Sequence, residues 1–347
     1  MKRSTFLSIG IIVLITFLIV VIKIIFPEEK PGAVKTVLTG KEWLNKEYGS
    51  DRMELRGKTT LIVFWSYADI NSRKALKNVL AWKEKYGEVL QVAGVYCPEF
   101  TFEREAKNIK KPLEGLKITF PVVLDNSGEL KLAFMNEVVP SLHLVNKQGR
   151  IVYSQKGDGA YDTTEAAVLE ALLKANPALS LPEPVQSPLS GVCYPTTPDI
   201  YCGASKGAIA NKEGIISDKT HNYKPTKLIP LDSLVLTGKY KAAKEYFETE
   251  SAGAGAALNF TATEVNIVAE ASSDEAVLEV LLNGKPVKNE IRSKNLDEKS
   301  QLKLKGPCLY QLIKNKSKPE KGIMTIKSLK GNFKIYAVKF YGCGEGQ

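Results

Sequence analysis

The amino-acid sequence predicts an α/β domain followed by an all-β sandwich domain, with a transmembrane helix at the N-terminus. Apolar strands alternate with helices from residue 37 to residue 176. Six prolines then mark residues 177–198, and beyond them strands without long helices favour an antiparallel β-sandwich. The predicted boundaries are an anchor (1–27), a stalk (28–36), the α/β domain (37–176), a proline-rich linker (177–198) and the β domain (199–347).

The first 27 residues predict a membrane anchor. A largely apolar run extends from Phe6 to Phe26, and its only charge is Lys23 near the far end. As a helix this run is about 31 Å long, which is enough to span the hydrocarbon core. It lacks the small residues of a cleavage site before Pro27, so we expect an uncleaved anchor. Lys2 and Arg3 should stay cytoplasmic, which places the remaining chain on the extracytoplasmic (periplasmic) side of the cell membrane.

The elements of the α/β domain follow from apolar runs and helix signals. A capping box, Asp162-Thr163-Thr164-Glu165, is expected to open the last helix, which ends at Asn176-Pro177. The glycine-containing stretch 146–150 suits a hairpin. Strands are expected at 60–65, 89–96, 120–124, 141–145 and 151–154, and a helix at 72–86.

In the β domain, residues 258–270 largely alternate between apolar and polar side chains, which is typical of a half-buried strand. Residues 277–282 lead into Asn283-Gly284, a hairpin turn signal. Residues 252–257, which are mostly alanine and glycine, are expected to form a turn. Further strands are expected at 309–313, 323–326 and 333–340.

Short motifs in both domains match one protein family. In the first domain they are Leu55-Arg56-Gly57-Lys58, Phe64-Trp65-Ser66-Tyr67, Ile70-Asn71, 94–100, 124–126, Val139-Pro140, 149–151, 157–161 and Thr164-Glu165. In the second domain they are 197–201, 236–240 and 308–313. On these motifs the first domain resembles the thioredoxin-like domain of the DipZ/TlpA group of extracytoplasmic thiol-disulfide proteins. The second is similar to the jelly-roll, carbohydrate-module-like unit that follows this domain in DipZ-type proteins.

The resemblance implies a disulfide-exchange site that this chain lacks. In the family, a cysteine at a helix N-terminus and a second cysteine one turn later exchange disulfides beside a cis-proline, often near a buried acid. These positions correspond to Asp69, Ser72, Pro140 and, for the acid, Val63. Only the proline remains, so we expect no catalytic residues of this kind and no thiol exchange here.

Two interpretations of Asp69 stay open. Aspartate is among the best N-cap residues, so Asp69 can be a structural cap of the helix. Alternatively, Asp69 and Asn71 form a polar binding spot beside Pro140. The predicted binding groove consists of Trp65, Tyr67, Asp69, Asn71, Ser72, Val139 and Pro140.

The chain has five cysteines. Cys97 is expected as a free thiol that fills space at a strand end, with a reactive thiol as the alternative. Outside the cytoplasm, the other four predict structural disulfides, and we expect the pairs Cys193–Cys202 and Cys308–Cys343. One redox-active pair among them is the alternative, although none has C-x-x-C spacing.

The remaining features exclude several functions. The lysines behind the net charge of +10 are spread along the chain, which favours a surface facing anionic lipid or cell wall over nucleic-acid binding. His143 and His221 form no ligand cluster, so neither a metal site nor a cofactor is expected. The aromatic residues of the β domain are expected mostly in its core, with stacking on sugar rings as the alternative. They are Tyr201, Tyr240, Tyr310, Phe333, Tyr336 and Tyr341.

Three functional hypotheses follow from these observations. The leading one is a redox-inactive, membrane-anchored module that binds extracytoplasmic client or partner proteins as a scaffold in envelope thiol-disulfide or protein-maturation pathways. The second is a thiol-disulfide oxidoreductase that works through non-standard cysteines. The third is a glycan-binding envelope protein that contacts the cell wall through its β domain.

Overall fold

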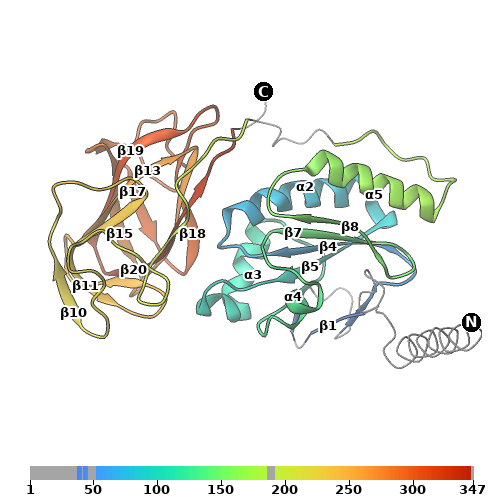
Figure 1. Ribbon diagram of the computed structural model, residues 1–347, viewed down its shortest axis with the longest axis horizontal. Coiled ribbons are helices and arrows are strands. Elements are labelled where there is room, and N and C mark those ends of the chain that lie inside the picture. Colours follow the sequence, from blue (N-terminus) through green and yellow to red (C-terminus); the bar gives the residue numbers. More distant parts are fainter. Residues whose placement is uncertain (1–36, 41, 46–51, 186–191, 345–347) are drawn as a thin grey trace, which may run out of the picture.

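The computed structural model describes residues 37–344 except residues 41, 46–51 and 186–191. The predicted anchor (1–27) and stalk (28–36) lie outside the described residues. Among the described residues, no helix is both long and apolar enough to cross a membrane. Figure 1 shows two domains side by side, one with helices packed around a sheet and one built of strands. The α/β and all-β classes predicted from the sequence are therefore confirmed.

A six-stranded sheet forms the centre of the first domain, in the order β2-β6-β5-β4-β7-β8. The strands β4, β5 and β6 are parallel to one another, whereas β2, β7 and β8 run antiparallel to their neighbours. The strands are β1 (Val37–Thr39), β2 (Trp43–Leu44), β3 (Arg52–Glu54), β4 (Thr59–Trp65), β5 (Leu90–Tyr96), β6 (Val122–Leu124), β7 (Ser141–Val145) and β8 (Ile151–Lys156). The helices are α2 (Ile70–Tyr86), α3 (Ala106–Gly115), α4 (Glu129–Ala133) and α5 (Tyr161–Ala175), with 3-10 turns at Gly87–Val89 and Thr101–Arg104.

The start of α5 differs from the prediction. The helix begins one residue before the expected cap, and its N-cap residue is Ala160 in a left-handed conformation. Asp162, the expected cap, is therefore exposed inside the first turn of the helix. Glu165, the other member of the box, is buried and accepts hydrogen bonds from Tyr86 and from the linker backbone at Val185. The capping-box prediction is wrong because the helix begins before Asp162 and tertiary contacts hold Glu165.

The second domain consists of one continuous sheet that folds into two layers. The main path runs β16-β15-β19-β13-β11-β12-β20-β14-β18, with β9, β10 and β17 attached at its sides. The strands are β9 (Ile200–Tyr201), β10 (Thr220–Tyr223), β11 (Ser233–Ala242), β12 (Phe247–Thr249), β13 (Gly255–Ala262), β14 (Glu264–Ala271), β15 (Ala276–Leu282), β16 (Lys285–Pro286), β17 (Gln301–Leu304), β18 (Cys308–Lys314), β19 (Glu320–Lys330) and β20 (Phe333–Tyr341).

Strand β11 carries the chain from one layer to the other. Its first half pairs with β13, and its last residues pair with β12. Gly238 lies between the two halves with φ of 94°, and a Cβ there would clash with Ala254. Residues 258–270, predicted as one alternating stretch, form two strands that separate at Thr263. The predicted turn at 252–257 is also partly wrong, because β13 already begins at Gly255.

The disulfide prediction is corrected by the structure. Cys193 pairs with Cys343, whereas Cys202 and Cys308 are free thiols. The chain around Cys193 runs antiparallel to the chain around Cys343, with backbone hydrogen bonds from Tyr194 to Gly342 and from Gly344 to Val192. Cys202, the predicted partner of Cys193, is enclosed in the core of the β domain and therefore cannot reach Cys193.

The β domain packs its β14-β20-β18 face onto the first domain. One apolar cluster spans the contact, with Ala68, Ile70 and Phe100 on one side and Val268, Leu309, Tyr336, Ala337 and Tyr341 on the other. Two ionic contacts lie within the same interface: Lys74 pairs with Glu264, and Lys339 pairs with Glu99. The interface covers the end of the first domain at which α2 begins.

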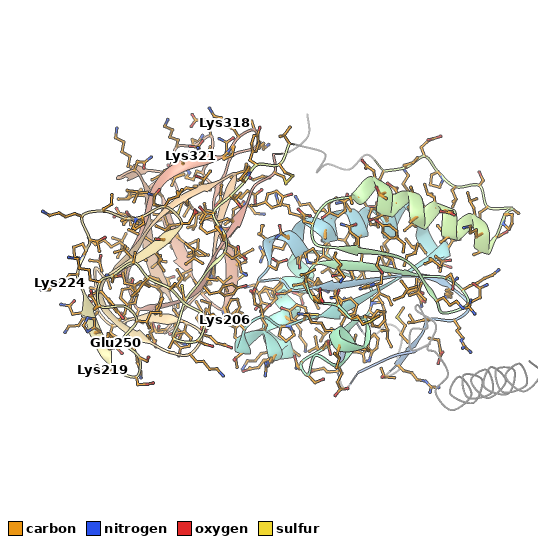
Figure 2. The ribbon with its side chains drawn as sticks, in the orientation of Figure 1. Lys206, Lys219, Lys224, Glu250, Lys318 and Lys321 are labelled. Atoms are coloured by element: carbon orange, nitrogen blue, oxygen red, sulfur yellow. A yellow bond between two sulfur atoms is a disulfide. The ribbon has the colours of Figure 1, made fainter. Side chains whose placement is uncertain are left out.

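The lysine side chains are spread over the surface of the β domain (Figure 2). Lys206 lies near the first domain, Lys224 at the far end of the molecule, and Lys318 and Lys321 along another edge. This distribution matches the spread seen in the sequence.

Candidate functional site

The candidate site lies where β4 passes into α2. All seven residues of β4 are buried, so the chain leaves the centre of the sheet and enters the helix directly. Asp69 is the N-cap of α2, and its Oδ2 accepts a hydrogen bond of 2.6 Å from the Ser72 backbone N–H. The Val139–Pro140 peptide bond is cis, and Pro140 is buried. Val63, the position matched to the family's acid, is fully buried in the core.

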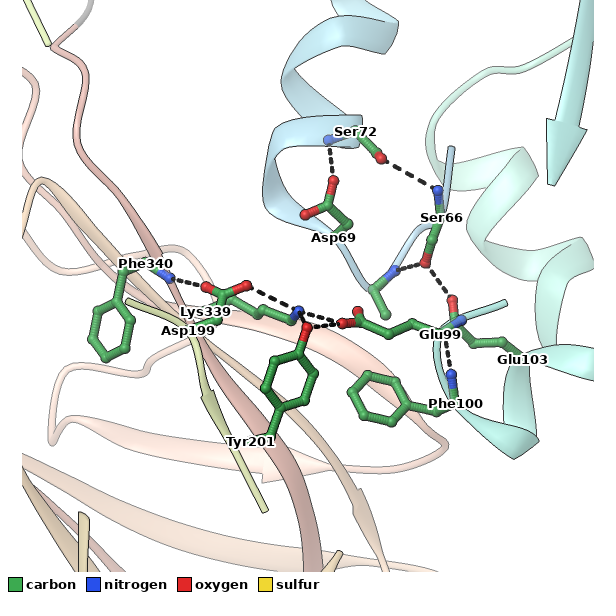
Figure 3. Close-up of polar contacts among 11 residues, drawn as sticks. Ser66, Asp69, Ser72, Glu99, Phe100, Glu103, Asp199, Tyr201, Lys339 and Phe340 are labelled. Carbon is green, nitrogen blue, oxygen red and sulfur yellow. Dashed lines mark hydrogen bonds and ion pairs between the residues drawn. The ribbon is translucent and has the colours of Figure 1, made fainter. Parts of the chain in front are cut away.

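A buried carboxyl group that the sequence analysis missed lies beside this turn. The Glu103 side chain is fully buried and accepts hydrogen bonds from Ser66 Oγ and from the backbone N–H groups of Glu99 and Phe100 (Figure 3). It also accepts a hydrogen bond from the Tyr96 hydroxyl. Burial raises the pKa of Glu103, while its hydrogen bonds act in the opposite direction. Glu103 therefore ties the loop that contains Glu99 to the turn before α2. In the sequence it stands in a charged stretch, Glu103-Arg104-Glu105, which looks solvent-exposed.

Lys339 of the β domain reaches across the interface toward the site. Its ammonium group lies 2.7 Å from Glu99 Oε1 and 3.0 Å from Asp199 Oδ2, and it also donates to the Tyr201 hydroxyl (Figure 3). Burial alone lowers the pKa of Lys339, but the two carboxylates outweigh this effect and hold it above its usual value. This buried cation links both domains next to Asp69.

A cleft of about 550 Å³ remains between the two domains at the site. Of the predicted groove residues, Asp69, Asn71 and Val139 line it, together with Cys97 and residues of the β domain such as Tyr201 and Lys206. The other predicted groove residues, Trp65, Tyr67, Ser72 and Pro140, are buried beneath this surface. Tyr67 is buried directly by the β domain, because its hydroxyl donates a hydrogen bond to the Pro307 carbonyl. The interdomain cleft is thus lined by three of the seven predicted groove residues.

Asp69 is an unusual carboxyl group because it is almost completely buried. It is 7% exposed, and this burial raises its pKa to about 6, although the Ser72 hydrogen bonds and Lys339 act in the opposite direction. At neutral pH the carboxylate is ionised. Figure 3 shows one oxygen bonded to the helix and the other directed away from it.

We expect the ionisation of Asp69 to make folding stability depend on pH. The ordinary pKa of an aspartate is 3.8, whereas the pKa of Asp69 in the folded protein is about 6. Between these two pH values the folded protein holds a proton at Asp69 that the unfolded chain releases. Stability should therefore fall as pH rises through this window, by about 3 kcal/mol for this group. In the D69N variant the cap is retained but the charge is not. Urea unfolding of both proteins should give a stability difference that grows from pH 4 to pH 6 and is then constant. A difference that does not change with pH would contradict the assignment.

The three free thiols differ in their environment. Burial, and next the carboxylate of Asp125, raise the pKa of Cys97 to about 12. Burial likewise raises the pKa of Cys202 above its usual value. Cys308 is half-buried, and the Arg73 guanidinium donates to its sulfur at 3.7 Å. Reactivity requires both exposure and stabilisation of the thiolate, so Cys308 is the candidate reactive thiol.

Alkylation of the native protein should therefore be selective. We expect maleimide to modify Cys308 at neutral pH within minutes, while Cys97 and Cys202 react only after unfolding, because a buried thiol with a raised pKa contains almost no thiolate. Peptide mass spectrometry after timed alkylation identifies the modified residues. Rapid modification of Cys97 in the folded protein would show that it is exposed and ionised, contrary to this account.

His143 and several aromatic residues of the β domain are buried inside the protein. His143 is buried, its ring lies 2.9 Å from Ser154 Oγ, and burial lowers its pKa to about 4. Within the described part of the chain, no group of three His, Cys, Asp or Glu residues is arranged to hold a metal ion. Tyr240 and Phe333 are in the β-domain core, whereas Tyr336 and Tyr341 contact the first domain.

Parallel strands that lead into a helix start at Asp69 define a thioredoxin-like α/β domain, here joined to a β domain. Residues 197–340 match a family model described as "Thioredoxin like C-terminal domain". The chain is 32% identical to Protein DipZ of Mycobacterium bovis over 256 residues, which is 70% of this chain and 35% of that protein. It is also 32% identical to the thiol-disulfide oxidoreductase YkuV of Bacillus subtilis over 136 residues, which is 39% of this chain and 91% of that protein.

A solved structure, the solution structure of a thioredoxin-like protein in the oxidized form, is 30% identical. It superposes with a TM-score of 0.38 and covers 42% of this chain and 98% of its own. The chain spans about a third of the length of the DipZ proteins that it matches. It belongs to the thioredoxin-like thiol-disulfide oxidoreductase family.

Proposed function

We propose that this protein is a membrane-anchored, extracytoplasmic member of its family that binds a partner polypeptide without exchanging disulfides. It would serve as a scaffold in envelope thiol-disulfide or protein-maturation pathways. One observation supports this most: a carboxylate, Asp69, occupies the helix start at which the family's chemistry needs a thiolate. A carboxylate stabilises a helix N-terminus as a thiolate does, but it cannot form a mixed disulfide.

The interdomain cleft is the proposed binding surface. Its wall contains Asp69, Asn71 and Val139, and its rim continues to Val138. Two further apolar side chains are exposed: Leu132 in α4, and Met135 just after it. In the sequence both stand between Lys131 and Val138, which line the cleft. An apolar rim beside a polar cleft suits a polypeptide segment that carries both kinds of side chain.

Two experiments test this proposal. The full chain should show no turnover in an insulin-reduction assay, and turnover that a cysteine-to-serine change abolishes would overturn the proposal. A photo-reactive amino acid at the half-exposed Asn71 should capture partner proteins in cells. The same group at Leu173 on the surface of α5 should not capture them, which makes it the matched control.

A thiol-disulfide activity is the second candidate function, and the environment of Cys308 favours it. Its sulfur lies next to the Arg73 guanidinium, in the first turn of α2. If this thiol carried an activity, C308S would abolish it and C97S would not. Equal activity in both variants would exclude Cys308 as its source.

A further inference from the structure

An exposed apolar loop projects from the β domain at a distance from the interdomain cleft. Residues 224–232 connect β10 to β11, and the first eight of them, here called the leucine loop, read Lys-Pro-Thr-Lys-Leu-Ile-Pro-Leu before Asp232. Leu228 is 78% exposed and Leu231 is 58% exposed. Large apolar side chains with this exposure are costly in water, and grouped ones mark interaction sites.

The loop is held in a fixed position. Its backbone carbonyl at Lys224 accepts from the Asn211 side chain, and that at Ile229 accepts from the Asn259 side chain at 3.0 Å. Thr226 Oγ1 donates to the carbonyl of Leu228 at 2.8 Å. These contacts fix the backbone that presents the two leucines, so their exposure does not depend on random motion of the loop.

The apolar patch extends onto the adjoining strands. Leu231 forms a bridge with Asn259 of β13, and Asn259 pairs in register with Ile323 of β19. Ile323 is 37% exposed. The patch therefore consists of Leu228, Leu231 and Ile323, and it lies on the side of β13 and β19 rather than on the face that contacts the first domain.

Cations surround this patch. The leucine loop contains Lys224 and Lys227, both exposed, and no acidic residue. Lys321 precedes Ile323 by two positions in β19 and is exposed as well. The acid that follows the loop, Asp232, accepts a hydrogen bond from Thr197. Figure 2 places Lys224 at the end of the molecule opposite the first domain.

We propose that the leucine loop is a membrane-docking site that inserts Leu228 and Leu231 into the interface of an anionic lipid bilayer. Apolar side chains flanked by lysines match the boundary between acyl chains and negatively charged headgroups. A protein tethered to the same membrane by the predicted anchor meets that surface at high effective concentration, so a small patch is sufficient. The site is separate from the interdomain cleft, so the inference rests on the membrane anchor of the proposed function and not on the partner binding proposed for the cleft.

Tryptophan fluorescence of the full chain in vesicles tests this inference. All three native tryptophans, Trp43, Trp65 and Trp82, are buried, so their emission should respond little to lipid. The L228W variant should be quenched by brominated lipids in vesicles of phosphatidylcholine with phosphatidylglycerol. L173W is the control, because Leu173 is also exposed but lies on α5 of the first domain, away from the patch and from the cleft.

We expect quenching of L228W to be at least about twofold stronger than that of L173W, and to weaken in vesicles of phosphatidylcholine alone and at high salt. Adding K224E and K227E to L228W should remove the difference. Equal quenching of L228W and L173W would overturn the inference. A blue shift of L228W without quenching by brominated lipid would also overturn it, because the loop would then contact protein, such as a second copy of the chain.

Discussion

The double variant D69C/S72C is expected to gain a reversible intramolecular disulfide and the capacity to reduce small disulfides, neither of which the native chain should have. The two positions are an N-cap and the third residue of α2, one helical turn apart. The cis-proline, Pro140, directly precedes β7, and its neighbour Val139 lines the cleft together with Asp69. The double variant would supply the two sulfur atoms of the site that the family resemblance implies, while Val63 would still stand at the position of its acid.

The local environment also sets the pKa of the introduced thiol. A thiolate at position 69 would accept the hydrogen bond that the Ser72 backbone now donates to Asp69, and Lys339 would add a favourable charge. For Asp69, burial outweighs both of these effects and raises the pKa. We therefore expect the pKa of the introduced thiol to lie above that of a free thiol, about 8.5. The pH dependence of alkylation measures this pKa, and a value below that of a free thiol would contradict the expectation.

Single variants supply the controls. D69C alone and S72C alone should form no intramolecular disulfide, and neither should turn over a small aromatic disulfide. The double variant should lose two hydrogens on oxidation, as seen by intact mass, and recover them with dithiothreitol. If the double variant kept both thiols free under oxidising conditions, the backbone at the start of α2 could not have the geometry of a disulfide-exchange site.

Much of the fold could be predicted because its signals are local. The apolar run of β4 and the spacing in α2 each specify one element, and they leave Asp69 at the helix start whatever the rest of the chain does. The capping box of α5 failed for the opposite reason. Glu165 makes a contact with Tyr86, far away in the sequence, and that contact rather than the local motif decides its role.

The interdomain cleft could not be predicted, because it depends on how the two domains dock. Lys339 lies in β20, and all but one residue of that strand are buried. The apolar run on either side of Lys339 could have indicated that both faces of this strand are covered. The partners of this lysine, Glu99 and Asp199, lie in separate loops, and nothing in their local sequence indicates that they meet. The burial of Tyr67 beneath Pro307 has the same origin.

Breaking the Lys74–Glu264 pair is expected to be among the most destabilising single changes in the interface. The two side chains are 4% and 3% exposed, and they join α2 to β14. Lys74 also lies over the Tyr341 ring, and Glu264 accepts a hydrogen bond from Gln311. Either K74M or E264Q leaves the other partner buried without its counter-charge. We expect each to lower the free energy of unfolding by about 3–5 kcal/mol.

The double variant K74M/E264L separates the cost of an unpaired charge from the value of the pair. With both charges removed, the interface becomes apolar, and stability should return to within about 1–2 kcal/mol of the native protein. K174A, which breaks the exposed Lys174–Glu170 pair on α5, should leave stability almost unchanged because water screens that pair. Guanidinium unfolding followed by tryptophan fluorescence gives these values, and small-angle scattering shows whether the domains separate. If K74M were as stable as the native protein, the pair could not be what holds α2 against the β domain, and the apolar cluster around Ile70 and Tyr341 would have to do so alone.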